Sequence, residues 1–153
     1  MNNLIVIALF CIAASAYGRP SELLTCSDRL KLLETSKPLL GRPTPKCDES
    51  GEYAPVQCQG SQCTCVESKW GNQISEEYTM NRWETQGMKC NCARDQYAYR
   101  ATGKLGLSFR CTQNGNYHPI QCIGSVCYCA DENGLQGENS PTVGIWETEK
   151  LKC

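Results

Sequence analysis

The sequence predicts a small disulfide-rich α+β protein made of two tandem domains, each with a short helix, a hairpin and three disulfides. The first reason is an internal repeat. Residues 46–66 and 110–130 are one segment written twice, 64 positions apart, and 10 of the 21 aligned positions are identical. The second reason is the cysteine content, 13 of 153 residues, which approaches the level of secreted disulfide scaffolds. The third is that the same helical and hairpin patterns recur in both halves.

The first 18 residues have the pattern of a secretory signal peptide. An apolar run from Leu4 to Ala14 is too short to span a bilayer and is followed by small residues. We expect cleavage after Gly18, with Ala16 as the second choice; a membrane anchor is the alternative. Cys11 leaves with this segment, and twelve cysteines remain, six per repeat. An even number of cysteines in an exported chain indicates disulfides rather than free thiols. Together with the signal peptide, this leads us to expect a secreted, extracellular mature protein.

Charge and spacing suggest how the two repeats are organised. We expect repeat 1 to span residues 19–90 and repeat 2 to span residues 91–153. The first range has 9 basic and 10 acidic residues, and the second has 6 of each. Neither has the basic excess of a nucleic-acid binder, so we expect no nucleic-acid partner. We also expect no membrane partner and a monomeric protein. Only Asn91 separates the two domains' cysteines, which predicts restricted relative motion.

Repeat 1 opens with a helix predicted over Glu22 to Thr35, because apolar residues recur there at helical spacing. Prolines prevent its continuation and make residues 36–45 an exposed loop. Two short strands follow, predicted over Glu52–Cys58 and Cys63–Val66 and joined by a four-residue hairpin loop. Residues 67–89 are predicted to be a long polar connection.

The hairpin geometry favours one disulfide pairing. Cys58 and Cys63 flank the loop and face each other, at a separation that suits a disulfide. Cys65 lies on the same strand face as Cys63 and is left for a distant partner, with Cys90 remaining. Of the many pairings that six cysteines allow, this favours first with second, third with fourth, and fifth with sixth.

Repeat 2 repeats these patterns with different loops. Ala93, Tyr97 and Ala101 form a weaker helical face, and residues 102–109 form a second exposed loop with glycines in place of prolines. The hairpin recurs, with residues 123–126 in its turn. Residues 131–152 form the final connection.

Catalytic and metal chemistry have little support in the sequence. His118 is the only histidine, and Ala54 occupies the matching position, so a surface role is expected. The cysteines pair off, which disfavours both a thiol nucleophile and a zinc site. Ser61 and Ser125 are expected to act in turns. We therefore expect no enzyme activity and no cofactor.

Aromatic residues are expected to support the loops rather than to bind a ligand. Tyr53 and Tyr117 are predicted to be half-buried, and Trp83 and Trp146 are predicted to anchor the two connections by packing. Exposed loops that disulfides hold rigid lose little entropy on binding. The sequence therefore predicts a binding module.

The run Cys-x3-Gly-x-Tyr-x-Pro-x-Gln-Cys, followed by Gly-Ser, Cys-x-Cys and a distant last cysteine, resembles the thyroglobulin type-1 repeat. The resemblance covers nearly the whole mature chain, twice, and is greatest to the two-repeat ctenitoxin-like thyropins of spider venom. It implies one short helix and a small antiparallel sheet with three disulfides per repeat. The implied disulfides are Cys26–Cys47, Cys58–Cys63, Cys65–Cys90, Cys92–Cys111, Cys122–Cys127 and Cys129–Cys153.

The resemblance also implies a function, because thyropins inhibit papain-like cysteine peptidases of the cathepsin type. Three loops form a wedge that fills the active-site cleft. In this chain the loops are residues 36–45, 60–62 and part of 68–74 in repeat 1, and 102–109, 124–126 and 133–141 in repeat 2. The candidate inhibitory residues are Pro43, Gln59, Gly60, Ser61, Gln62, Trp70, Gly106, Ile123, Gly124, Ser125, Val126 and Leu135.

The chain departs from the family pattern in two ways. Thr64 and Tyr128 stand where the family often has tryptophan, so we expect Trp83 and Trp146 to fill the core instead. The four-residue second loop is shorter than in inhibitory members. The alternative function is a non-inhibitory binding module or a venom toxin that acts on a receptor, a growth factor or a channel, although a channel blocker would need a basic cluster.

Overall fold

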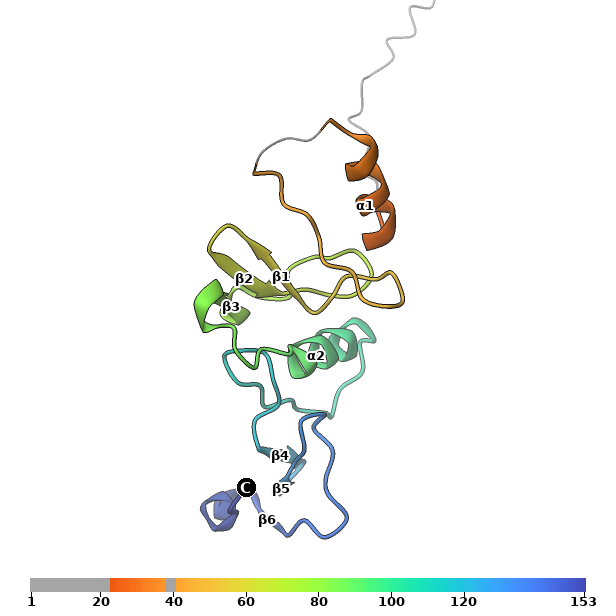
Figure 1. The fold of residues 1–153 in the computed structure, drawn as a ribbon. Coiled ribbons are helices and arrows are strands. Elements are labelled where there is room, and N and C mark those ends of the chain that lie inside the picture. Colours follow the sequence, from red (N-terminus) through yellow and green to blue (C-terminus); the bar gives the residue numbers. More distant parts are fainter. Residues whose placement is uncertain (1–22, 38–40) are drawn as a thin grey trace, which may run out of the picture.

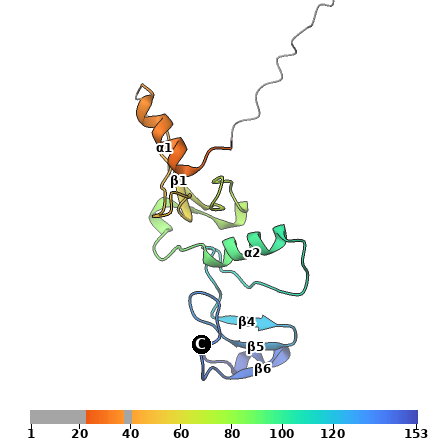
Figure 2. The same ribbon diagram turned by 90° about the vertical axis from the view of Figure 1, so that its right-hand side faces the viewer.

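The computed structural model describes residues 23–37 and 41–153. The expected signal peptide, its cleavage site and Cys11 lie outside these residues, as do positions 38–40 of the first predicted loop. Figures 1 and 2 show α1, the first sheet, α2 and the second sheet following one another along the long axis of the molecule. Within the described residues, no helix has the length and apolar character needed to cross a membrane.

Helix α1 spans Cys26–Thr35, so it begins later than the predicted start at Glu22, a residue outside the described part. Thr25 sets the start, because its side-chain oxygen accepts a hydrogen bond from the backbone N–H of Asp28 at 3.3 Å. At the other end, the backbone N–H of Ser36 donates to the carbonyl of Leu33. Local capping thus limits the helix to ten residues.

The first sheet has three antiparallel strands, β1 (Val56–Gln59), β2 (Gln62–Cys65) and β3 (Thr79–Asn81), in that order. The predicted start of β1 at Glu52 is wrong. Pro55 has no N–H to donate to a ladder, and the strand begins just after it. The prediction also missed β3, which lies inside the supposed polar connection, between the short 3₁₀ helices η1 (Glu76–Tyr78) and η2 (Arg82–Glu84).

Repeat 2 has the same order of helix and strands, and its described residues contain no counterpart to η1. Helix α2 is followed by a second three-stranded antiparallel sheet and a last 3₁₀ helix. Their bounds are α2 (Asn91–Ala101), β4 (Ile120–Ile123), β5 (Val126–Cys129), β6 (Thr142–Gly144) and η3 (Ile145–Lys150). The fold is therefore the small disulfide-rich α+β architecture expected from the sequence, present twice.

Disulfides form much of the interior. The twelve cysteines of the described residues make six bonds, which are the pairs implied by the family resemblance. The largest side chains with almost no exposed surface are all cysteines: Cys26, Cys63, Cys65, Cys90, Cys92 and Cys127. Sulfur takes the place that branched aliphatic side chains hold in larger domains, as expected where a short chain cannot build a large core.

The expectation that the two tryptophans fill the core is wrong. Trp83 is 73% exposed and Trp146 is 75% exposed. Each follows a three-residue edge strand in a 3₁₀ turn, which directs the indole outward. Buried Tyr78 and Met88 pack around the Cys65–Cys90 disulfide instead. Tyr53, expected to be half-buried, is fully buried against Cys26 and Val66.

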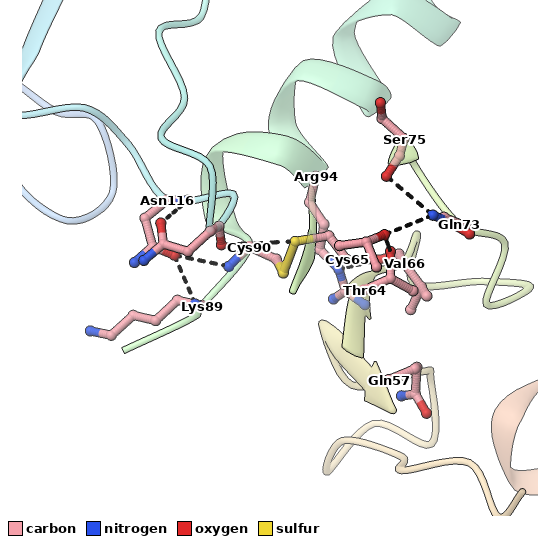
Figure 3. The surroundings of a disulfide bond; sticks show 12 residues. Gln57, Thr64, Cys65, Val66, Gln73, Ser75, Lys89, Cys90, Arg94 and Asn116 are labelled. Carbon is pink, nitrogen blue, oxygen red and sulfur yellow. Dashed lines mark hydrogen bonds between the residues drawn. A yellow bond between two sulfur atoms is a disulfide. The ribbon is translucent and has the colours of Figure 1, made fainter. Parts of the chain in front are cut away.

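A shared joint connects the two repeats. Ala93 of α2 belongs to the same buried cluster as Cys65 and Cys90 of repeat 1. Figure 3 shows Arg94 of α2 beside Val66. Its guanidinium donates hydrogen bonds to the carbonyls of Val66 (2.8 Å) and Tyr53 (2.6 Å). Burial lowers the pKa of Arg94, and nearby Asp48, Glu52 and Glu67 oppose that shift.

Asn116 closes the joint from the other side (Figure 3). Its side-chain oxygen accepts from the backbone N–H groups of Lys89 (2.7 Å) and Cys90 (3.1 Å), and its amide donates to the carbonyl of Gly87 (2.7 Å). Lys89 also pairs with Glu132 of repeat 2. These contacts favour restricted motion between the repeats, which stays a prediction, as does the boundary between residues 90 and 91.

Candidate functional site

Both hairpins end in a two-residue turn, so the four-residue loops predicted from the sequence are wrong. Gln59 pairs with Gln62, and Ile123 pairs with Val126, which extends each strand by one residue. Gly60 and Gly124 have a φ of +59°. The serine that follows each has negative φ, and glycine at the first turn position with positive φ is typical of a type II′ turn.

A disulfide braces each turn at the second residue pair. Cys58 faces Cys63 and Cys122 faces Cys127, with a Cα–Cα distance of 4.0 Å in each pair. The 3₁₀ helix that follows each third strand supports the turn from the side. The carbonyl of Ser61 accepts from the N–H of Arg82 at 2.8 Å. Ser125 has the matching bond at 2.9 Å. Each tip is therefore a narrow, preorganised projection.

In repeat 1 the structure brings several predicted site residues to one groove. Pro43 of the first loop, Gln59 and Gln62 of the hairpin, and Gly71 of the third loop line a groove of about 420 Å³. Trp70 does not join them. It lines a separate hollow beside α1, with Lys69 4.8 Å from its ring centre.

In repeat 2 the first loop is tied to the hairpin. The hydroxyl of Ser108 donates to the carbonyl of Cys122 at 3.3 Å, next to Ile123. Gly106 lies between exposed leucines in this loop, and Leu105 is 96% exposed. Leu135 of the third loop is also exposed. The candidate residues of repeat 2 are thus largely apolar, unlike those of repeat 1.

A carboxylate holds each third loop, and sequence reasoning missed both. Glu67 is buried and accepts from the backbone N–H groups of Lys69 (2.8 Å), Trp70 (2.7 Å) and Asn72 (3.2 Å). Asp131 occupies the matching position of repeat 2 and organises its own loop in the same way. An acidic residue one place after the Cys-x-Cys-x run in both repeats was the available signal.

The joint residues Arg94 and Asn116 were also missed. Asp28 and Glu52 stand at the matching positions in repeat 1. Aligning the two repeats therefore shows that the residues at these positions differ, but not what Arg94 and Asn116 contact. Their role depends on contacts between the repeats, which the spacing of residues within one repeat does not reveal.

The described residues give no support for metal or thiol chemistry. Within 23–37 and 41–153, no three metal-binding side chains gather into a possible ion site. The cysteines there are all in disulfides, which leaves no thiolate. His118 is half-buried, and its Nδ1 accepts from the backbone N–H of Ile120 at 3.1 Å. What these loops offer is a rigid surface for contact.

Comparison with known proteins points to one family. The model of the thyroglobulin type-1 repeat matches residues 25–92 and 108–145. Mouse thyroglobulin is 34% identical over 106 residues, which is 65% of this chain but only 4% of that protein. The chain therefore spans a small fraction of the thyroglobulins it matches.

Two smaller relatives are similar over more of their own length. U20-hexatoxin-Hi1a of Hadronyche infensa is 29% identical over 149 residues, covering 93% of this chain and 94% of the toxin. Equistatin of Actinia equina is 28% identical over 98 residues, covering 60% of this chain and 42% of equistatin. With the family model matched in both halves, and with the helix, the three-stranded sheet and three disulfides present in each, the chain belongs to the thyroglobulin type-1 repeat family.

Proposed function

We propose that this protein is a secreted inhibitor of papain-like cysteine peptidases of the cathepsin type, with repeat 1 at residues 19–90 and repeat 2 at residues 91–153. It blocks the active-site cleft with disulfide-braced loops and is not itself an enzyme. Membership of the thyroglobulin type-1 family and the resemblance to thyropins support this. The observation that carries the proposal is the pair of narrow hairpin tips, each braced by a disulfide and by a hydrogen bond from the 3₁₀ helix that follows the third strand.

The geometry of the tips supports a mode of inhibition in which the peptidase does not inactivate the inhibitor by cutting it. A preformed turn loses little conformational entropy on binding, so more of the contact energy becomes affinity. Cys58–Cys63 and Cys122–Cys127 enclose the turns. If a peptidase cut the Gly-Ser bond, the disulfide would still hold the two cut ends of the inhibitor together.

An inhibition panel tests the proposal. The mature chain should inhibit at least one of papain and cathepsins B, L and S competitively and reversibly, with an inhibition constant below about 1 µM. Reduced and alkylated protein should lose this activity, and trypsin should be unaffected. If none of the four peptidases is inhibited, the proposal is wrong.

The relative named as a toxin supports a second candidate, because the two chains match over nearly their whole length. In this alternative the protein is a non-inhibitory toxin or binding module that acts on a receptor, a growth factor or a channel. The near balance of charge disfavours a channel blocker that relies on a basic cluster. Cell-surface binding by the labelled chain, together with a negative peptidase panel, would favour this candidate.

A further inference from the structure

The tip of repeat 2 carries an apolar row that repeat 1 lacks. Ile123 and Val126 lie directly opposite each other across the hairpin, so their side chains share a face of the sheet. Val126 in turn pairs with Gly144 of β6. Positions 123, 126 and 144 therefore form a line across three strands.

Trp146 completes this line. A Cβ atom at Gly144 would lie 3.1 Å from the indole of Trp146, so the indole occupies the space that a side chain at position 144 would fill. Ile123, Val126 and Trp146 are 59%, 46% and 75% exposed. We call these three residues the apolar row.

The row lies on the outer face of the hairpin. Cys122 and Cys127, whose side chains point to the opposite face, pack with buried Leu151. In Figure 2 the turn between β4 and β5 lies at the right-hand edge of the molecule. The apolar row is therefore not an extension of the core, and none of its three residues belongs to a buried cluster of the described residues.

Repeat 1 provides a natural control for this arrangement. Gln59, Gln62 and Asn81 occupy the matching line. The amide of Gln62 donates to Asn81 at 3.1 Å, and Asn81 donates to Glu84 at 2.9 Å. A side chain at position 81 occupies the space that Gly144 leaves for an indole, and the same scaffold presents a polar tip.

Charge and area identify the kind of partner. Repeat 2 has six basic and six acidic residues, and Glu147 and Lys150 beside the row pair with each other. An anionic membrane would need a basic excess. Three projecting side chains expose a few hundred Å², well short of the roughly 800 Å² that each partner gives a standard interface. Two convex tips pressed together would bury no more than these side chains, which is too little for a stable dimer. A narrow apolar cleft can also enclose the sides of the tip.

We propose that the apolar row is the partner-contacting edge of repeat 2, and that it docks in a peptidase cleft with apolar subsites. This inference rests on the proposed function and adds which repeat and which side chains select the target. Repeat 2 prefers peptidases whose subsites are apolar, and the polar tip of repeat 1 does not share that preference.

The test uses the mature chain and two matched double variants. I123Q/V126Q gives repeat 2 the residues of repeat 1, and Q59A/Q62A alters the same two positions in repeat 1. Loss of two buried aliphatic contacts should weaken inhibition by I123Q/V126Q at least about tenfold. Against a peptidase with apolar subsites, Q59A/Q62A should weaken inhibition by a smaller factor than I123Q/V126Q does, because the polar tip of repeat 1 does not supply the apolar contact. Equal thermal midpoints would show that both variants fold.

A second readout reports contact directly. In 5-fluorotryptophan-labelled protein, the ¹⁹F signal of Trp146 should shift when unlabelled peptidase binds, and that of Trp83 should not. W146F and W83F variants assign the signals. Unchanged inhibition by I123Q/V126Q, or a shift at Trp83 alone, would overturn the inference while leaving the proposed function intact.

Other outcomes separate the remaining possibilities. Binding of the chain to anionic phospholipid vesicles through Trp146, or a dimer in sedimentation that I123Q/V126Q abolishes, would replace the peptidase with a membrane or a second copy. If the parent chain inhibits no peptidase, the proposed function fails and this inference fails with it.

Discussion

The hairpin of repeat 1 ends in Gln59 and Gln62, and the hairpin of repeat 2 ends in Ile123 and Val126, although both turn through Gly-Ser. The scaffold beneath them is the same, with a cross-strand disulfide, a third strand, and a hydrogen bond from the following 3₁₀ helix to the turn. The disulfide framework therefore constrains the backbone and leaves the outermost side chains free to differ.

The two helices differ in a related way. Helix α1 lies at one end of the molecule, whereas α2 lies between the two sheets (Figure 1). Asp28 of α1 is exposed, and Arg94 at the matching position of α2 bonds two carbonyls of repeat 1. The helices at matching positions of the two repeats thus have different roles, because α2 joins the repeats and α1 packs within repeat 1.

The largest expected effect comes from removing this joint. R94A should lower the free energy of unfolding by about 3 kcal/mol, because it removes two hydrogen bonds from a charged donor and leaves the carbonyls of Val66 and Tyr53 without that donor. The matched D28A on α1 should cost less than about 1 kcal/mol. Urea unfolding measures both. A loss of stability in R94A no larger than in D28A would contradict this role of Arg94.

The hairpin disulfides should have the next largest effect. Each closes a short loop, so C58S/C63S should cost about 2 kcal/mol. C122S/C127S should cost about 1 kcal/mol more, because Cys122 and Cys127 pack with buried Leu151 and their loss also leaves a cavity. Thermal unfolding of the two double variants compares them. Equal destabilisation would show that Leu151 does not depend on this bond.

The smallest effect is expected at the exposed tryptophans. W83A and W146A should each change the free energy of unfolding by about 0.5 kcal/mol or less, whereas truncation of a core tryptophan costs roughly 3–5 kcal/mol. W146A should have the larger effect of the two, because its indole lies over Gly144. A loss of several kcal/mol in the free energy of unfolding for either variant would show that its tryptophan is part of the core.

Much of the scaffold could be predicted because cysteine spacing limits the chain strongly. Cys58 and Cys63 indicated a hairpin, and the repeated segment indicated two copies of it. The turn was predicted two residues too long because a disulfide between Cys58 and Cys63 is compatible with both a four-residue loop and a two-residue turn. The strand at Thr79–Asn81 was missed because three residues with two polar side chains show no periodicity.

The candidate site was predicted less completely. Recurrence of Trp83 and Trp146 showed that the position matters, but not whether the indole points inward, since a 3₁₀ turn after a short strand decides that. Arg94 and Asn116 act across the repeats, where spacing along the chain carries no signal. Glu67 and Asp131 could have been found from their shared position before the third loop.

The joint built by Arg94 and Asn116 also sets the distance between the two tips. A flexible tether lets two binding sites search a volume, so their effective concentration depends on its length. Here Asn91 alone connects the repeats, and side chains bond across it. If the joint holds the repeats rigid, two targets fixed on a surface at the spacing of the tips would be bound with avidity, and targets at other spacings would be bound one at a time.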